Sequence, residues 1–349
     1  MAIRHIFIAA SLALAFAKTN AENPASGKYG YTTAYDYIIV ASLENYPDLK
    51  ALCDDTPDLS GCVLGGSTVI NSMNYINPSR DDFDAVWPKG WQWDDIQASA
   101  AKLYKRNPGI INPSVDGRCY DSIVYDVLSK ELAQAGYNSV NTVTNPNDKK
   151  RIYGHSAVNV MNGLRSGPVR TYLPLAQCHK IMVQTHCFSR RNNQIDIVYQ
   201  VTFGTITVGS MGMNAAGKAI YTKSALLQTA ADKEALTIEL DNWLAMSRTP
   251  GSRLVYSGGA NTNGAEIIKT NGIGTGYHLT SSTIMGTDNG TKGGKSVVDT
   301  NYKVYGIDNL FVVDLRIHPK VPSGDTMVIT MIATEHAVTK ILELGNKGW

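Results

Sequence analysis

Two short stretches of the chain contain residue types suited to holding a cofactor and moving a proton. Gly65-Gly66-Ser67 offers small residues and free backbone N–H groups where a chain must pass close to a planar ring or a phosphate. The same three residues alone would also fit a tight turn before a helix. His278 lies in the run YHLTSST, and a neutral imidazole can accept a hydroxyl proton while a hydride leaves the carbon. A lone histidine, however, is often only structural.

Three longer stretches are more specific together than any one alone. They are GCVLGGSTVINSMNYINPSRDDFDAVWPKGW (residues 61–91), NGLRSGPVRTYLP (residues 162–174), and the C-terminal part from YHLTSSTIMG to the end of VVDLRIHPKVPSGDTMVITMIATEHAVTKIL. In combination they resemble the glucose–methanol–choline (GMC) family of FAD-dependent oxidoreductases. Within that family the chain is most similar to the flavin domain of cellobiose dehydrogenase. The resemblance runs from about Tyr35 to Leu344, without any separate haem domain.

The resemblance implies a set of site residues. His278 corresponds to the catalytic base, and Asp325 lies in the loop where the family usually has a second His or an Asn. The FAD contacts expected by resemblance are Gly65, Gly66, Ser67, Asn71, Met73, Asp314, Thr326 and Met327. A helix that begins at Thr326 would point its N-terminus at the pyrimidine end of the flavin, where negative charge develops on the reduced ring. The spacing of the other histidines indicates no metal site.

The sequence departs from the family pattern in the cofactor domain. Residues 35–40 (YDYIIV) read as its first buried strand, but Ala41-Ser42-Leu43-Glu44 follow where a Gly-x-Gly-x-x-Gly loop should bind the pyrophosphate. A later strand and helix are also absent between Tyr199 and Phe203. Each lost phosphate contact removes on the order of 1 kcal/mol or more of binding free energy. FAD is therefore expected by resemblance, but with weakened binding.

A second departure concerns Asp325. A neutral Asn can donate a hydrogen bond to the substrate oxygen, whereas an ionised Asp can only accept one. An ionised Asp325 would also favour the imidazolium form of a nearby His278 and weaken it as a base. The alternative to an enzyme is therefore a non-catalytic secreted remnant of the family, or the product of a truncated gene, that binds a carbohydrate or a partner. A serine hydrolase is disfavoured because no Gly-x-Ser-x-Gly elbow occurs.

The expected fold is mixed α/β and α+β, with a truncated Rossmann-type FAD-binding domain and an antiparallel-sheet substrate domain. We expect a signal peptide over residues 1–21 and the truncated FAD-binding domain, with part of the substrate domain, over residues 22–200. Residues 201–276 would form the sheet and helix of the substrate domain. Residues 277–349 would return to the FAD-binding domain with the catalytic motif.

The N-terminus and the overall composition indicate an exported protein. Arg4 and His5 precede a short apolar run over residues 6–17 and small residues typical of a secretory cleavage site. The formal charge of +2 does not favour nucleic acid as a partner, and no later segment is apolar enough for a membrane anchor. The expected partners are a sugar or alcohol substrate and an unidentified electron acceptor. The sequon Asn289-Gly290-Thr291 indicates an exposed loop.

Local patterns predict several elements that must position the site. Helices are expected over residues 94–104 with Asp94 as N-cap, and over residues 122–136, 232–246 and 327–344. A strand ending at Asp314 and short strands within residues 180–208 are also expected, whereas residues 257–276 read as a loose loop. The tryptophans 87, 91 and 93 fit core packing better than a sugar-stacking surface. Five cysteines permit the disulfides Cys53/Cys62 and Cys178/Cys187 and leave one thiol over.

Overall fold

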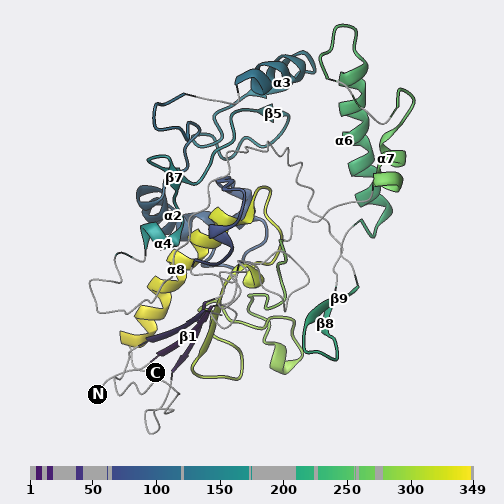
Figure 1. The fold of residues 1–349 in the computed structure, drawn as a ribbon. Coiled ribbons are helices and arrows are strands. Elements are labelled where there is room, and N and C mark those ends of the chain that lie inside the picture. The colour runs from purple at the N-terminus through teal and green to yellow at the C-terminus, as the bar shows by residue number, and fades with distance from the viewer. Residues whose placement is uncertain are drawn as a thin grey trace.

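The computed structural model describes residues 5–9, 14–18, 37–41, 61, 65–118, 122–172, 174, 210–223, 227–254, 256, 259–271 and 278–346. The largest sheet has four strands in the order β10-β2-β1-β3 (Figure 1). These strands are β1 (His5–Ala9), β2 (Leu14–Lys18), β3 (Tyr37–Ala41) and β10 (Leu310–Val313). β1 pairs in parallel with β3, and β2 pairs antiparallel with both β1 and β10. The sheet therefore joins the N-terminal residues to the strand that precedes Asp314.

The N-terminal strands modify one expectation from the sequence. Residues 37–41 form the strand expected over residues 35–40. The segment read as a signal peptide, however, supplies β1 and β2 to the sheet of the full-length chain instead of lying outside the fold. Its alternating and β-branched apolar residues suit a buried strand as well as an export signal. Cleavage of this segment stays a prediction.

The helices follow the apolar periodicity of the sequence, with differences at their ends. Helix α2 (Trp93–Arg106) begins after Gln92, whose side chain forms a capping box with Asp95, so Asp94 is not the N-cap that the sequence suggested. Asp94 instead binds Arg80, with 2.7 Å between carboxylate and guanidinium. Helix α3 (Ser122–Gln134) ends just before Gly136, whose φ of 79° requires a left-handed residue there.

Two other expected helices are also present. α6 (Ala230–Arg248) and α8 (Thr326–Asn346) extend slightly beyond the predicted limits. Residues 264–271, expected to be loop, form α7 (Gly264–Asn271) instead. Gly264 allows this because its backbone lies against α6, where a Cβ would come within 2.5 Å of the Thr237 carbonyl oxygen. Gly264 therefore marks a close helix contact within the stretch that the sequence suggested was loose.

The remaining elements are short. They are η1 (Gly66–Val69), α1 (Asp81–Asp84), β4 (Asn138–Ser139), β5 (Ile152–Tyr153), β6 (Val160–Met161), β7 (Leu164–Arg165), α4 (Pro168–Thr171), β8 (Ser210–Met213), β9 (Ala219–Lys223), η2 (Gly290–Lys292) and η3 (Leu315–Ile317). β6–β7 and β8–β9 are separate two-stranded antiparallel pairs, and β8–β9 lies within residues 201–276, where the substrate-domain sheet is expected. No helix in the described ranges is long and apolar enough to cross a bilayer.

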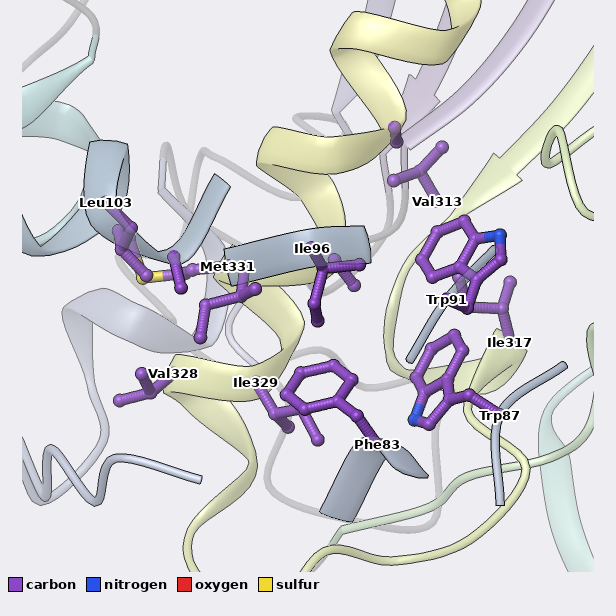
Figure 2. Close-up of a cluster of buried hydrophobic side chains, with 14 of the residues drawn as sticks. Phe83, Trp87, Trp91, Ile96, Leu103, Val313, Ile317, Val328, Ile329 and Met331 are labelled. Atoms are coloured by element: carbon purple, nitrogen blue, oxygen red, sulfur yellow. The ribbon is translucent and has the colours of Figure 1, made fainter. Parts of the chain in front are cut away.

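The main core lies where α8 packs against α2 (Figure 1). The first turns of α8, from Thr326 to Ala333, are buried on every side, as expected for a helix in the centre of a domain. Figure 2 shows Phe83, Trp87 and Trp91 packed beside the apolar residues of these two helices. The rings of Trp87 and Trp91 are stacked with their centroids 5.0 Å apart, and both side chains are almost fully buried. Their role in the core is thus confirmed over a sugar-stacking surface.

Several expectations concern residues outside the described ranges. They are the strands expected between residues 180 and 200, the strand over residues 205–208, and the proposed disulfides Cys53/Cys62 and Cys178/Cys187. These stay predictions.

Candidate functional site

The third motif brings His278 and Asp325 together at the start of α8. The His278 Nε2 atom lies 3.9 Å from an Asp325 carboxylate oxygen, and both side chains are partly buried, with 24% and 11% of their surface exposed. The backbone of residues 283–285 bonds to residues 316 and 317, which holds the segment that follows His278 against the end of β10. Ser281, at a φ of 67°, donates its hydroxyl to the His318 carbonyl oxygen at 2.8 Å. Residues predicted from two parts of the motif therefore lie side by side.

Asp325 is held by the helix that it precedes. Its carboxylate accepts a hydrogen bond from the Met327 backbone N–H at 3.2 Å. Burial raises the pKa of Asp325 above the ordinary range of a carboxyl group, while His278 and the backbone N–H groups of Thr326 and Met327 act in the opposite direction. A carboxyl group so placed is easier to protonate than one in water. It can then donate a hydrogen bond, as the neutral Asn of related sites does.

The first motif forms a glycine turn that leads to Asn71. Gly65 and Gly66 have φ values of 91° and 57°, which favour glycine, and η1 follows directly. Ser67 accepts a hydrogen bond from the Gly61 backbone N–H at 3.0 Å. Ser67 thus closes the turn onto itself, so the local geometry alone accounts for the small residues here.

Asn71 joins all three motifs. Its amide nitrogen donates to the sulfur of Met327 at 3.4 Å, at the first turn of α8. Its amide oxygen accepts from the Met73 backbone N–H at 3.1 Å and from the Arg165 guanidinium at 2.7 Å. Arg165 belongs to the second motif and also donates to the Thr68 carbonyl oxygen at 3.2 Å. Seven of the eight expected cofactor residues thus lie on segments that meet at this end of α8.

Arg165 is a site residue that the sequence analysis did not single out. Its guanidinium is half-buried, and burial lowers its pKa. Among the described residues, this cation donates to two neutral oxygen atoms, on Thr68 and Asn71. The motif NGLRSGPVRTYLP, which contains Arg165, was recognised in the sequence. Residue spacing alone, however, does not indicate which of its arginines faces inward.

Asp82 anchors the loop that carries Asp325. One of its oxygens accepts the Ser323 backbone N–H at 2.7 Å, and the other accepts the Ser323 hydroxyl at 2.8 Å. That second oxygen also accepts the backbone N–H and the hydroxyl of Ser79, at 2.7 and 2.8 Å. Gly324 lies so close to Ile76 that a Cβ there would come within 2.5 Å of a side-chain methyl group. The first motif therefore fixes the backbone just before Asp325.

Asp314 is placed at the end of β10, as predicted, but its carboxylate is already engaged. It is 3% exposed and accepts hydrogen bonds from the backbone N–H and the guanidinium of Arg316, at 2.7 and 3.2 Å. Burial nevertheless raises the pKa of Asp314 to about 6, with Arg316 opposing the shift. A cofactor contact by Asp314 stays a prediction.

The described residues contain a small hollow elsewhere. It has a volume of about 140 Å³ and is lined by Asp299 and residues 303–308, so it includes neither His278 nor Asp325. Ligand pockets usually reach several hundred Å³. Within the described ranges, no three His, Cys, Asp or Glu side chains cluster as metal ligands would.

Comparison with known proteins identifies the family of the three motifs. Sequence models of GMC oxidoreductases match residues 55–204 and residues 203–334, for the N-terminal and C-terminal parts. A protein of Acanthamoeba polyphaga mimivirus, named as a truncated GMC-type inactive oxidoreductase, is 46% identical over 71 residues, which are 20% of this chain and 15% of that protein. Another protein of the same virus, named as a GMC-type oxidoreductase, is 39% identical over 56 residues, 16% of this chain and 7% of its own length.

Solved structures show the same fold. Pyridoxine 4-oxidase from Mesorbium loti matches with a TM-score of 0.59 over 82% of this chain and 85% of its own, at 14% identity. Identity this low establishes a shared fold alone. The segments matched in the curated relatives span only 15% and 7% of their length, so they carry no activity over to this chain.

Proposed function

Because the chain belongs to the GMC oxidoreductase family, we propose that it is a secreted FAD-dependent oxidoreductase that acts on CH–OH groups of a sugar or an alcohol, as cellobiose dehydrogenase does. The observation that carries this proposal is the approach of His278 Nε2 to Asp325 within 3.9 Å at the N-terminus of α8. This pair combines a proton acceptor with a carboxyl group at the end of a helix whose dipole favours nearby negative charge.

The two side chains have complementary roles in this proposal. His278 accepts the hydroxyl proton of the substrate at Nε2, and the carboxylate of Asp325 stabilises the imidazolium that forms. A protonated Asp325 instead donates a hydrogen bond to the substrate oxygen, and its raised pKa makes this form more accessible. FAD, when bound, supplies the acceptor for the hydride.

The residues fit one end of FAD better than the other. Asn71 contacts Met327 in the first turn of α8, and by resemblance to the family we assign this contact to the flavin-ring end of the cofactor. The dinucleotide end lacks its phosphate loop in the sequence, because Ala41-Ser42-Leu43-Glu44 replace it. The space beside the Cα of Gly65 is filled by Val169, because a Cβ there would come within 2.5 Å of a Val169 methyl group. We therefore expect binding weaker than that of a complete phosphate loop.

A second candidate function is a non-catalytic secreted remnant of the family with a carbohydrate- or partner-binding role. The missing phosphate loop favours the non-catalytic remnant, because it removes contacts to the cofactor. The packing of Val169 against Gly65 favours it for the same reason. The carboxyl group of Asp325 favours it too, since an ionised form cannot donate to a substrate oxygen. Both candidate functions assume descent from the same family, and they differ in whether the protein still catalyses hydride transfer.

An assay of substrate oxidation separates the two candidates. The protein would be supplied with excess FAD and a dye as electron acceptor, and a panel of cellobiose, glucose and simple alcohols would be tested for dye reduction. We expect reduction that is lost in His278→Gln and retained or increased in Asp325→Asn, which restores a neutral donor. Absence of substrate-dependent reduction in both the wild type and Asp325→Asn would establish the remnant.

Secretion is tested separately by the mass of the exported protein. A signal peptide over residues 1–21 predicts a mature chain that starts at about residue 22. Such a chain lacks β1 and β2, so β3 and β10 lose the neighbours that they have in the full-length sheet. An intact mass that includes residue 5 in exported protein would show that these strands are retained, and absence of export would refute secretion.

A further inference from the structure

The loop that follows the stretch YHLTSSTIMG carries the one sequon that proline does not block, Asn289-Gly290-Thr291. Asn289 precedes the short helix η2 and is partly exposed, while Gly290 and Thr291 are exposed. The expectation of an exposed loop is therefore confirmed. Nothing in the proposed oxidation uses these residues.

The side-chain amide of Asn289 is hydrogen-bonded through its oxygen and not, among the described residues, through its nitrogen. Its amide oxygen accepts two hydrogen bonds, from the Thr291 backbone N–H at 2.9 Å and from the Thr291 hydroxyl at 2.8 Å. Within the described ranges, the amide nitrogen has no hydrogen-bond partner of its own. The hydroxyl residue that defines the sequon thus holds the carboxamide through its oxygen and leaves the nitrogen available for modification.

The loop is braced beneath this side chain. The Gly290 backbone N–H donates to the Ser296 carbonyl oxygen at 2.9 Å, and Asp288 accepts from the Lys295 backbone N–H at 2.9 Å and from the Ser296 hydroxyl. Residues 291–293 on the outer side are exposed. A bulky group on Asn289 can therefore extend into solvent without breaking the contacts that fold the loop.

An apolar turn lies beside the sequon. A Cβ on Gly306 would come within 3.3 Å of a Thr291 methyl group, which places the turn at residues 304–307 next to Thr291. Ile307 in this turn is 42% exposed, and Val297, whose carbonyl oxygen accepts from Tyr305, is 37% exposed. A hydrophilic group at Asn289 would shield this small apolar surface from contact with other chains.

From these contacts we propose that Asn289 carries an N-linked oligosaccharide. In this reaction the sugar C1 of a lipid-linked oligosaccharide diphosphate forms a bond to the Asn289 amide nitrogen. The bond from C1 to the phosphate oxygen breaks, the lipid diphosphate leaves, and the nitrogen loses one proton. The inference rests on the secretory part of the proposed function, because the donor and its transferase are in the secretory pathway, and is independent of FAD.

The test is expression of the full chain in a eukaryotic secretory host, followed by treatment with an endoglycosidase. We expect one enzyme-sensitive shift in gel mobility, which Asn289→Gln and Thr291→Val abolish and Thr291→Ser retains. Asn263→Gln is the matched control, because Asn263 is also followed by glycine but has Ala265 in place of the hydroxyl residue. This control should leave the shift unchanged.

A second arm distinguishes failure of this inference from failure of secretion. The full chain is also placed behind an established cleavable signal and translated with microsomes, where protection from added protease reports entry. Protected chains that lack the endoglycosidase-sensitive shift would overturn the inference. A shift only with the added signal would support Asn289 as acceptor and refute secretion by the native N-terminus.

Discussion

Replacement of Asp82 by alanine should loosen the loop that carries Asp325. Asp82 accepts four hydrogen bonds, two from Ser79 and two from Ser323, all between 2.7 and 2.8 Å. Hydrogen bonds to a charged group contribute about 1.5–3 kcal/mol each when buried, and less at a partly exposed site such as this one. Taking about 0.5–1 kcal/mol for each bond, we expect Asp82→Ala to lower the free energy of unfolding by about 2–4 kcal/mol.

The assay for this prediction is chemical denaturation combined with hydrogen exchange. The control is Asp81→Ala, because Asp81 is exposed and its side chain makes no hydrogen bond to the described residues, so its effect should stay within about 0.5 kcal/mol. In Asp82→Ala, the backbone N–H of Ser323 should exchange faster, whereas exchange in α6 should be unchanged. This local readout distinguishes release of the loop from general destabilisation.

A double-mutant cycle isolates the contact between the two motifs. Ser323→Ala removes the hydroxyl that donates to Asp82, and the two substitutions together should cost less than the sum of their separate effects, by about 0.5–1 kcal/mol. Equal stability of Asp82→Ala and Asp81→Ala, or strictly additive effects in the cycle, would refute the assignment of Asp82 as the anchor of this loop.

Three further predictions follow from groups near the site. His318 is fully buried, both of its ring nitrogens lack partners in the described structure, and burial lowers its pKa to about 3. Stability should therefore fall as the pH drops below about 6.5, and His318→Phe should flatten this dependence by up to about 2 kcal/mol between pH 7.5 and pH 5, as measured by denaturation. The raised pKa of Asp314, about 6, acts in the opposite direction, so stability is lost as the pH rises from about 4 to about 6. Between pH 4 and pH 7 the free energy of unfolding of Asp314→Asn should rise relative to that of the wild type by up to about 3 kcal/mol, and parallel pH profiles of the two proteins would contradict this. Gly324→Ala should destabilise the protein by about 1–3 kcal/mol because the new Cβ clashes with Ile76. In thermal denaturation, adding Ile76→Ala to this variant should recover part of the lost stability, and no recovery would show that the clash is not the cause.

The sequence predicted those elements whose apolar pattern and local stop signals agree. The long helix α8, helix α3 with its stop at Gly136, and the strand before Asp314 all follow from periodicity and from residues within the element itself. Helix α7 was missed because its stability comes from packing of Gly264 against α6, a contact that local composition does not encode.

The site shows the same division between local and distant information. His278 and Asp325 could be predicted as neighbours only through the resemblance, since nothing in their spacing indicates a contact of 3.9 Å. The guanidinium of Arg165 and the carboxylate of Asp82 were not identified as site groups, because their partners lie far away along the chain. The N-terminal apolar run illustrates a real ambiguity, since the same residues suit both an export signal and the strands β1 and β2.

We propose that the chain retains a flavin site despite the missing phosphate loop. The most direct measurement is the visible absorption spectrum of the purified protein, before and after incubation with FAD and removal of the free cofactor. We expect a protein-bound flavin spectrum, at least after FAD is added, that is weakened in Asn71→Leu. A spectrum without flavin absorption, both as purified and after FAD has been supplied, would contradict it.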